Sequence, residues 1–171
     1  GMDFRSLVAA LPGKKASIYT FERGKAARHP HTALHADVVD ARTRLRNWGV
    51  GVGTRVGIYA PNSYQWLVHD LALIELGAIS MPFTDDFAGK VNRELLDKYN
   101  IALLLMAKTH ARIFPEKPTF VAFLDAPNDD EVKALERTPS GDADEADQHS
   151  LVFSSGSAGG LKGLVISRKG I

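Results

Sequence analysis

The chain has 171 residues, of which 44% are hydrophobic and 24% are charged, a composition typical of a folded domain with a core. Its formal net charge of +1 excludes a strong overall attraction to nucleic acid or to an anionic membrane surface. The absence of cysteine excludes disulfides and cysteine-ligated metals and fits a reducing compartment, so we expect a cytoplasmic protein. We expect no membrane span, because no apolar run approaches the roughly 18–20 residues that one requires.

Strands and helices are predicted to alternate through the first three quarters of the chain. Pro30 makes the second strand either an edge strand or an irregular one, and the run at residues 101–107 is apolar on both faces, which indicates a central strand. This alternation predicts the α/β class, with a layered, largely parallel sheet flanked by helices. In chain order we expect strands at 17–21 and 27–34, a helix at 35–48, a strand at 55–60, a helix between Ser63 and Gly77, a strand at 78–83, a helix around 91–99, and strands at 101–107 and 119–124.

The helix that begins near residue 63 carries clear local signals. Asn62 or Ser63 can cap its free N–H groups, and Gln65 stands three residues after Asn62, as in a capping box. The helix is apolar nearly throughout, so it should be buried. We interpret His69, within this helix, as a core histidine with satisfied hydrogen bonds rather than as a catalytic base. Trp66 is likewise interpreted as a core residue.

Composition divides the chain into three parts. Residues 1–125 form the α/β core, residues 126–148 form an acidic linker, and residues 149–171 contain a strand, a glycine-rich loop and a second strand. The last two strands are predicted at residues 150–154 and 163–167.

The loop at residues 153–163, FSSGSAGGLKG, has the composition of a phosphate-binding site. Its successive backbone N–H groups can form a concavity for an anion, its hydroxyls are further donors, and Lys162 supplies a positive charge. It is not a P-loop, because the glycine before the lysine and the hydroxyl after it are missing and no helix follows. Composition alone leaves a glycine-rich hairpin turn open as the alternative. The residues that we assign to phosphate binding are Ser154, Ser155, Gly156, Ser157, Gly159, Gly160 and Lys162.

Other groups of polar residues receive structural interpretations. His29, His31 and His35 lack the spacing and the carboxylate partners of a metal site, so we expect surface or strand-end histidines. A turn explains Asp85 and Asp86 as well as a carboxylate pair does. The serines of the loop do not indicate a serine hydrolase, because the G-x-S-x-G elbow is absent.

Two regions of the sequence together resemble the adenylate-forming enzymes, which include acyl-CoA synthetases, luciferases and peptide-synthetase adenylation domains. The loop with its flanking strands, LVFSSGSAGGLKGLVIS, is similar to the family's hydroxyl-rich T-S-G-T-T-G-x-P-K-G signature. Residues 45–83 resemble a second family region, and the two stand in the family's order and at about its separation. The resemblance covers most of the chain. The matching positions in the second region are Gly53, Arg55, Val56, Pro61, Asn62, Ser63, Trp66, Gly77, Ala78 and Pro82.

The chain departs from the family pattern at four positions. Ala158 stands where a second hydroxyl is usual, and Leu161 replaces a frequent proline. Thr54 replaces the usual aspartate, and Arg168 stands where a histidine is common. None of these changes removes the backbone cradle or Lys162. Two alternatives to an enzyme therefore stay open: a non-catalytic binding module that keeps the fold, and an unrelated α/β nucleotide-binding domain.

The resemblance implies a two-step reaction with ATP and Mg²⁺ as cofactors. A small-molecule carboxylic acid attacks the α-phosphate of ATP, which gives an acyl-adenylate and pyrophosphate, and the acyl group then passes to the thiol of coenzyme A or of a carrier protein. The catalytic residues and the acid-binding pocket are expected beyond Ile171, so we expect an N-terminal fragment that is inactive alone. The resemblance implies that the β- and γ-phosphates are bound by Ser155, Ser157 and Lys162 and by the backbone at Gly156 and Gly159.

Overall fold

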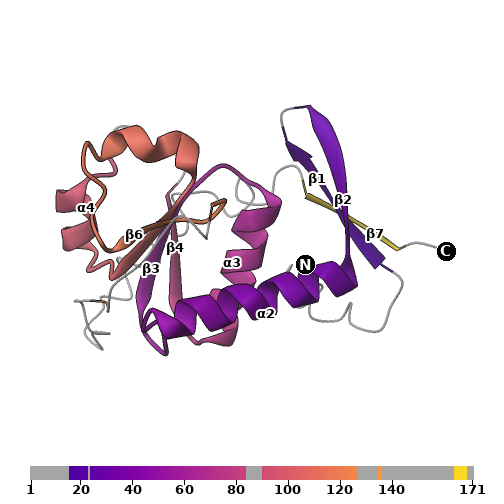
Figure 1. Cartoon of the computed structure of the whole chain (residues 1–171), viewed down its shortest axis with the longest axis horizontal. Coiled ribbons are helices and arrows are strands. Elements are labelled where there is room, and N and C mark those ends of the chain that lie inside the picture. The colour runs from indigo at the N-terminus through magenta and orange to yellow at the C-terminus, as the bar shows by residue number, and fades with distance from the viewer. Residues whose placement is uncertain (1–15, 23, 84–89, 127–134, 136–163, 169–171) are drawn as a thin grey trace.

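The computed structural model describes residues 16–22, 24–83, 90–126, 135 and 164–168 (Figure 1). No helix in these parts of the chain combines the length and the apolar character needed to cross a bilayer. The elements are β1 (Ala16–Glu22), β2 (Lys25–Pro30), α2 (His31–Asn47), β3 (Arg55–Tyr59), α3 (Tyr64–Glu75), β4 (Ile79–Phe83), α4 (Arg93–Lys98), β5 (Leu103–Met106), the 3-10 helix η2 (Lys108–Ile113), β6 (Val121–Phe123) and β7 (Leu164–Arg168).

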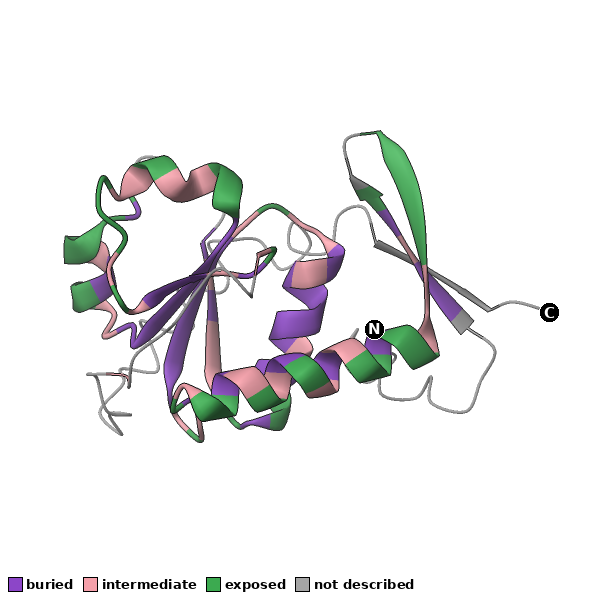
Figure 2. Ribbon diagram, viewed as in Figure 1, coloured by how far each residue is buried: buried purple, intermediate pink, exposed green. Residues whose placement is uncertain are grey.

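The centre of the fold is a parallel sheet. Its described strands lie in the order β4-β3-β5-β6, and every neighbouring pair is parallel. Strands β3 and β5 are buried along their whole length (Figure 2), as expected of strands covered on both faces. The predicted α/β class, the parallel sheet and the central place of β5 are therefore confirmed.

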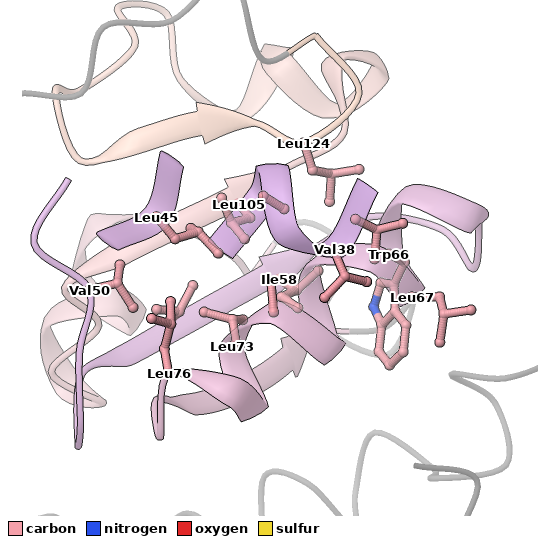
Figure 3. Packing of buried hydrophobic residues seen from close by; sticks show 14 of the residues in the cluster. Val38, Leu45, Val50, Ile58, Trp66, Leu67, Leu73, Leu76, Leu105 and Leu124 are labelled. Carbon is pink, nitrogen blue, oxygen red and sulfur yellow. The ribbon is translucent and has the colours of Figure 1, made fainter. Parts of the chain in front are cut away.

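Alternate side chains of the parallel sheet enter two separate cores. Val56 and Ile58 of β3 belong to the core that the sheet forms with α2 and α3. Figure 3 shows Ile58 in this core near Val38 of α2. Tyr59 belongs to the other core, together with Leu96 of α4. The period of two in the strand thus places one layer of helices on each face of the sheet.

Helix α2 begins four residues earlier than its apolar pattern predicts. The structure ends β2 at Pro30, which has an extended backbone at the N-cap position, and His31 starts the helix. Leu34, predicted as strand, is buried on the same helical face as Val38, because residues four apart share a face. The prediction that Pro30 lies on an edge strand is confirmed, since β2 is the outer strand of its sheet.

Ser63 caps helix α3. Its Oγ accepts a hydrogen bond from the backbone N–H of Trp66 at 3.1 Å. The capping box predicted from Asn62 and Gln65 is therefore wrong, because Ser63 as N-cap places Trp66, not Gln65, at the third helical position.

Replacing Ser63 by alanine is expected to lower the free energy of unfolding by about 1 kcal/mol, because a helix N–H loses its acceptor. Chemical denaturation measures this change. Ser63→Asp is the matched control, since its carboxylate can accept the same hydrogen bond and suits a helix N-terminus. Equal destabilisation by both substitutions would contradict a capping role.

A second sheet lies beside the parallel one. Its hairpin of β1 and β2 corresponds to the strands predicted at 17–21 and 27–34, whereas the pairing of β1 with β7 was not predicted. The sheet is antiparallel in the order β2-β1-β7, and it lies near the N-terminal end of α2 (Figure 1). The strand predicted at residues 163–167 is confirmed in shifted form as β7. The strand predicted at 150–154 and most of the acidic linker lie outside the described residues.

Candidate functional site

The order of the parallel strands creates a topological switch point. From β3 the chain passes through α3 to β4 on one side of β3, and later returns to place β5 on the other side. In open α/β sheets, ligands bind outside the carboxyl ends of the strands at such a point. The carboxyl ends of β3 and β5 are therefore the first place to look for a site.

A pocket of about 330 Å³ lies at this edge of the sheet. The segments that follow β3, β5 and β6 form its wall, and Phe21 of β1 reaches it from the second sheet. Its described lining consists of Phe21, residues 60–63 and Gln65, Ala107 and Thr109, and Leu124 and Asp125.

The described lining offers hydrogen bonds but no positive charge. Asn62, Gln65 and Thr109 are neutral and polar, and Asp125 is the one carboxylate among the described lining residues. An Asp125 oxygen accepts a hydrogen bond from the backbone N–H of Lys108 at 3.0 Å, which ties the segments after β5 and β6 together. A polyphosphate at this edge would therefore need a cation from another segment.

Strand pairing places β7, the strand that follows the predicted phosphate loop, close to the same edge. Leu164, the first residue of β7, pairs with Thr20 of β1. The next residue of β1, Phe21, lines the pocket. The strand that follows the loop therefore starts beside the pocket, and β7 can be followed next to β1 in Figure 1. The seven residues assigned to phosphate binding, from Ser154 to Lys162, lie outside the described residues, as do Asp85 and Asp86.

Of the three clustered histidines, His29 makes contacts within the fold. The His29 ring stacks on Tyr64 with 3.7 Å between ring centroids, and its Nε2 lies 3.1 Å from the hydroxyl of Thr20. His31 and His35 belong to the first turns of α2. Within the described ranges, no group of three or more histidine, aspartate or glutamate side chains is arranged to hold a metal ion.

His69 is a buried core residue, as predicted. Its side chain is 1% exposed, and its Nδ1 lies 2.7 Å from the carbonyl oxygen of Gln65. The guanidinium of Arg44 donates to Nε2 at 3.0 Å, so Nε2 is the acceptor and Nδ1 carries the proton. Burial, together with the charge of Arg44, lowers the pKa of His69 to about 4, against the weaker opposite effect of the Gln65 hydrogen bond. A neutral imidazole held in the core explains this position without any catalytic role.

Sequence reasoning missed most of the pocket. Phe21, Thr109 and Asp125 carry no motif, and only their position near the carboxyl ends of predicted strands could have indicated them. Asn62 and Ser63 were noticed as helix caps and as family positions, and the structure places them in the pocket wall.

The AMP-binding enzyme family model matches residues 4–171, nearly the whole chain. The chain belongs to the AMP-binding enzyme family. The adenylate-forming resemblance of the loop and of residues 45–83 is thereby confirmed at the level of the family.

Individual AMP-binding relatives are distant. One of the linear gramicidin synthase proteins of Brevibacillus parabrevis is 28% identical over 130 residues, which cover 74% of this chain and 2% of that protein. The N-terminal subdomain of Klebsiella oxytoca NpsA aligns with a TM-score of 0.55 and 13% identity, over 80% of this chain and 33% of that one.

Two further solved structures show the same fold. O-succinylbenzoate coenzyme A synthetase of Bacillus subtilis, in complex with AMP, aligns at a TM-score of 0.55 and 14% identity over 81% of this chain and 35% of that one. Fatty acid AMP ligase of Legionella pneumophila aligns at a TM-score of 0.57 and 16% identity, over 80% of this chain and 25% of that one. The chain thus spans about a third or less of these structures, and the fold is that of the N-terminal part of adenylate-forming ligases.

Proposed function

We propose that this chain is the ATP-phosphate-binding part of a ligase that activates a small-molecule carboxylic acid. The observation that carries the proposal is the convergence of two segments at one edge of the fold. The β1–β7 pairing brings the residue after the loop beside Phe21, which lines the switch-point pocket. Membership of the AMP-binding family supplies the nucleotide class.

The residues of the chain have separate roles in this proposal. The loop from Ser154 to Lys162 holds the β- and γ-phosphates, the eventual leaving group, through backbone N–H groups, hydroxyls and one ammonium. Lys162 supplies the cation that the described wall of the pocket does not contain. Neutralising the leaving pyrophosphate makes the attack of the carboxylate on the α-phosphate easier, which is electrostatic stabilisation.

The proposal assigns no residue of this chain as a ligand of Mg²⁺. The described residues contain no cluster of three acidic or histidine side chains suited to a metal. In nucleotide enzymes Mg²⁺ is held largely by the substrate's own phosphates and water, with one or two carboxylates. We therefore derive no step of the reaction from a metal bound to this chain.

The second half-reaction is proposed as transfer of the acyl group to a thiol, of coenzyme A or of a carrier protein. The names of the similar proteins include a coenzyme A synthetase, a gramicidin synthase and a fatty acid AMP ligase, so they support the adenylation step more firmly than any one acceptor. An acyl-CoA synthetase is one of the enzyme classes that would fit this proposal.

The test uses the full-length protein that contains this chain. We expect carboxylate-dependent exchange of labelled pyrophosphate into ATP with at least one acid from an aliphatic, aromatic and amino acid panel. Lys162→Ala should lower kcat/KM for ATP by about 10- to 100-fold, because one charge-assisted hydrogen bond contributes about 1.5–3 kcal/mol. Lys25→Ala, which removes an exposed lysine of β2, is the charge-matched control and should leave the exchange unchanged.

The outcomes separate the proposal from its alternative. Exchange that persists undiminished in Lys162→Ala contradicts the role of that lysine. ATP binding by the wild-type protein without exchange for any acid favours a non-catalytic binding module, which the alanine at position 158 and the arginine at position 168 make the second candidate.

A further inference from the structure

A continuous series of contacts joins the strand that leaves the predicted phosphate loop to the helices beside the pocket. It starts at β7, whose first residue, Leu164, pairs with Thr20 in the middle sheet strand β1. The Thr20 side chain is 1% exposed, and its hydroxyl is hydrogen-bonded to Nε2 of His29 on the neighbouring strand β2 at 3.1 Å. Thr20 and His29 thus connect the three strands of this sheet.

The aromatic ring of Tyr64 continues the series from the sheet to the helices. It stacks on His29 with 3.7 Å between the centroids and 8° between the planes. Tyr64 is the first residue of α3 and is 6% exposed. Its hydroxyl donates a hydrogen bond to Oδ2 of Asp37 on α2. One buried side chain at the start of α3 therefore contacts both β2 and α2.

The place of Tyr64 in the chain connects it directly to the pocket. Ser63 and Gln65, its two neighbours in sequence, both line the pocket at the carboxyl end of β3. A shift of the Tyr64 ring would therefore move the antiparallel sheet relative to the pocket wall. Burial and the hydrogen bond to Asp37 raise the pKa of Tyr64 above its ordinary value, so the hydroxyl stays a proton donor throughout the neutral range.

We propose that Asp37, Tyr64, His29 and Thr20, here called the Tyr64 clamp, position the exit strand of the phosphate loop against the switch-point edge of the parallel sheet. Tyr64 is a positioning residue in this scheme, because it acts on the loop through β2, β1 and β7 and touches no reacting atom. The inference rests on the proposed function, since it assumes that the loop ahead of β7 holds the phosphates of ATP.

The clamp is suited to positioning because its contacts have fixed directions. Stacked rings and a hydrogen bond between buried or half-buried groups restrict both distance and orientation, whereas apolar packing alone is non-directional. An error of about 1 Å in the placement of a binding group is enough to weaken catalysis strongly. The clamp therefore predicts an effect on ATP binding in addition to its effect on stability.

The experiment compares Tyr64→Phe and His29→Ala with the wild type in the full-length protein. Tyr64→Phe removes the hydrogen bond to Asp37 and keeps the ring, whereas His29→Ala removes both the stack and the bond to Thr20. We expect the KM for ATP in pyrophosphate exchange to rise about fivefold or more, since one lost hydrogen bond corresponds to about 1 kcal/mol. The KM for the carboxylic acid should stay within about twofold, and amide hydrogen exchange at residues 164–168 should become faster.

The matched control is Arg42→Gln, which breaks the exposed ion pair between Arg42 and Glu75. That pair also joins α2 to α3, with 2.6 Å between Nη1 and Oε2, but it involves neither β1 nor β2. We expect the control to leave both the KM for ATP and the amide hydrogen exchange at residues 164–168 unchanged, because exposed ion pairs contribute little to stability.

Several results would overturn the inference. Amide hydrogen exchange that becomes faster in β3 and β5 as much as in β7 would show a loss of global stability rather than of positioning. An unchanged KM for ATP would show that the clamp does not act on the phosphate loop. The proposed function fails separately, if the wild-type protein shows no carboxylate-dependent exchange. Hydrogen exchange at residues 164–168 then still decides whether the clamp holds β7.

Discussion

Lowering the pH from about 7 to about 4 is expected to remove about 3 kcal/mol from the free energy of unfolding through His69 alone. The imidazole has an ordinary pKa near 6.5 in the unfolded chain, and burial lowers it to about 4 in the folded protein. Between these two values the unfolded state binds a proton that the folded state excludes, so stability falls as the pH falls. The stability is complete above about pH 6.5 and is lost progressively down to about pH 4.

The measurement is chemical denaturation at a series of pH values for the wild type and for His69→Gln. Glutamine carries no charge in either state, so the difference in unfolding free energy between the two proteins isolates the titration of His69. The carboxylates elsewhere in the chain contribute equally to both curves. We expect the difference to change by about 3 kcal/mol across this range, and two parallel curves would contradict a neutral, buried His69.

Replacing Gly57 by alanine is expected to destabilise the protein by about 1–3 kcal/mol, because the centre of β3 has no room for a methyl group. A Cβ at this position would lie 2.8 Å from Cε2 of Phe83 and 3.0 Å from Cδ1 of Leu104. Both neighbours are fully buried in the core on the α4 side of the sheet, so neither can move away without disturbing its own packing.

Gly51 provides the matched control for this substitution. A Cβ there would meet no atom within 4 Å, and the backbone does not require glycine. Gly51→Ala should therefore be neutral or slightly stabilising, through the lower entropy of the unfolded chain. Shortening the obstructing ring with Phe83→Leu in the Gly57→Ala background should recover part of the loss. A double-mutant cycle without coupling between residues 57 and 83 would show that the close contact is not the cause.

The part of the fold that follows local patterns could be predicted from the sequence. The apolar runs at β3 and β5 and the nearly apolar helix α3 indicated a covered parallel sheet, because burial on both faces leaves no polar positions. The boundaries of the helices were predicted less accurately than their presence. The N-cap of α3 was left between Asn62 and Ser63, and only the hydrogen bond to Trp66 decides between them.

The start of α2 shows why such boundaries escape sequence reasoning. His31 to Leu34 are compatible with a strand or with a helix when read alone. In the structure Leu34 is buried with Val38 of α2 and with Trp66 of α3, and this tertiary burial favours the helix. Local propensity is weaker than the free energy of burying a leucine side chain.

For the candidate site, the sequence predicted the chemistry, and the tertiary structure shows where β7, the strand after the loop, lies. The glycines, hydroxyls and Lys162 of the loop predict phosphate binding from their own composition, and the family comparison agrees with the class. The roles of these individual residues stay predictions, since they lie outside the described residues.

Neither the pairing of β1 with β7 nor the pocket could be derived from residue patterns. The pairing of Thr20 with Leu164 joins residues far apart in the chain, and the pocket gathers Phe21 and Asp125 from segments that no motif connects. Local patterns decide whether a segment forms a strand or a helix, because hydrogen bonds and burial repeat with a short period. Which strands then become neighbours depends on the packing of the whole chain, and that packing alone places β7 beside β1, whose Phe21 lines the switch-point pocket.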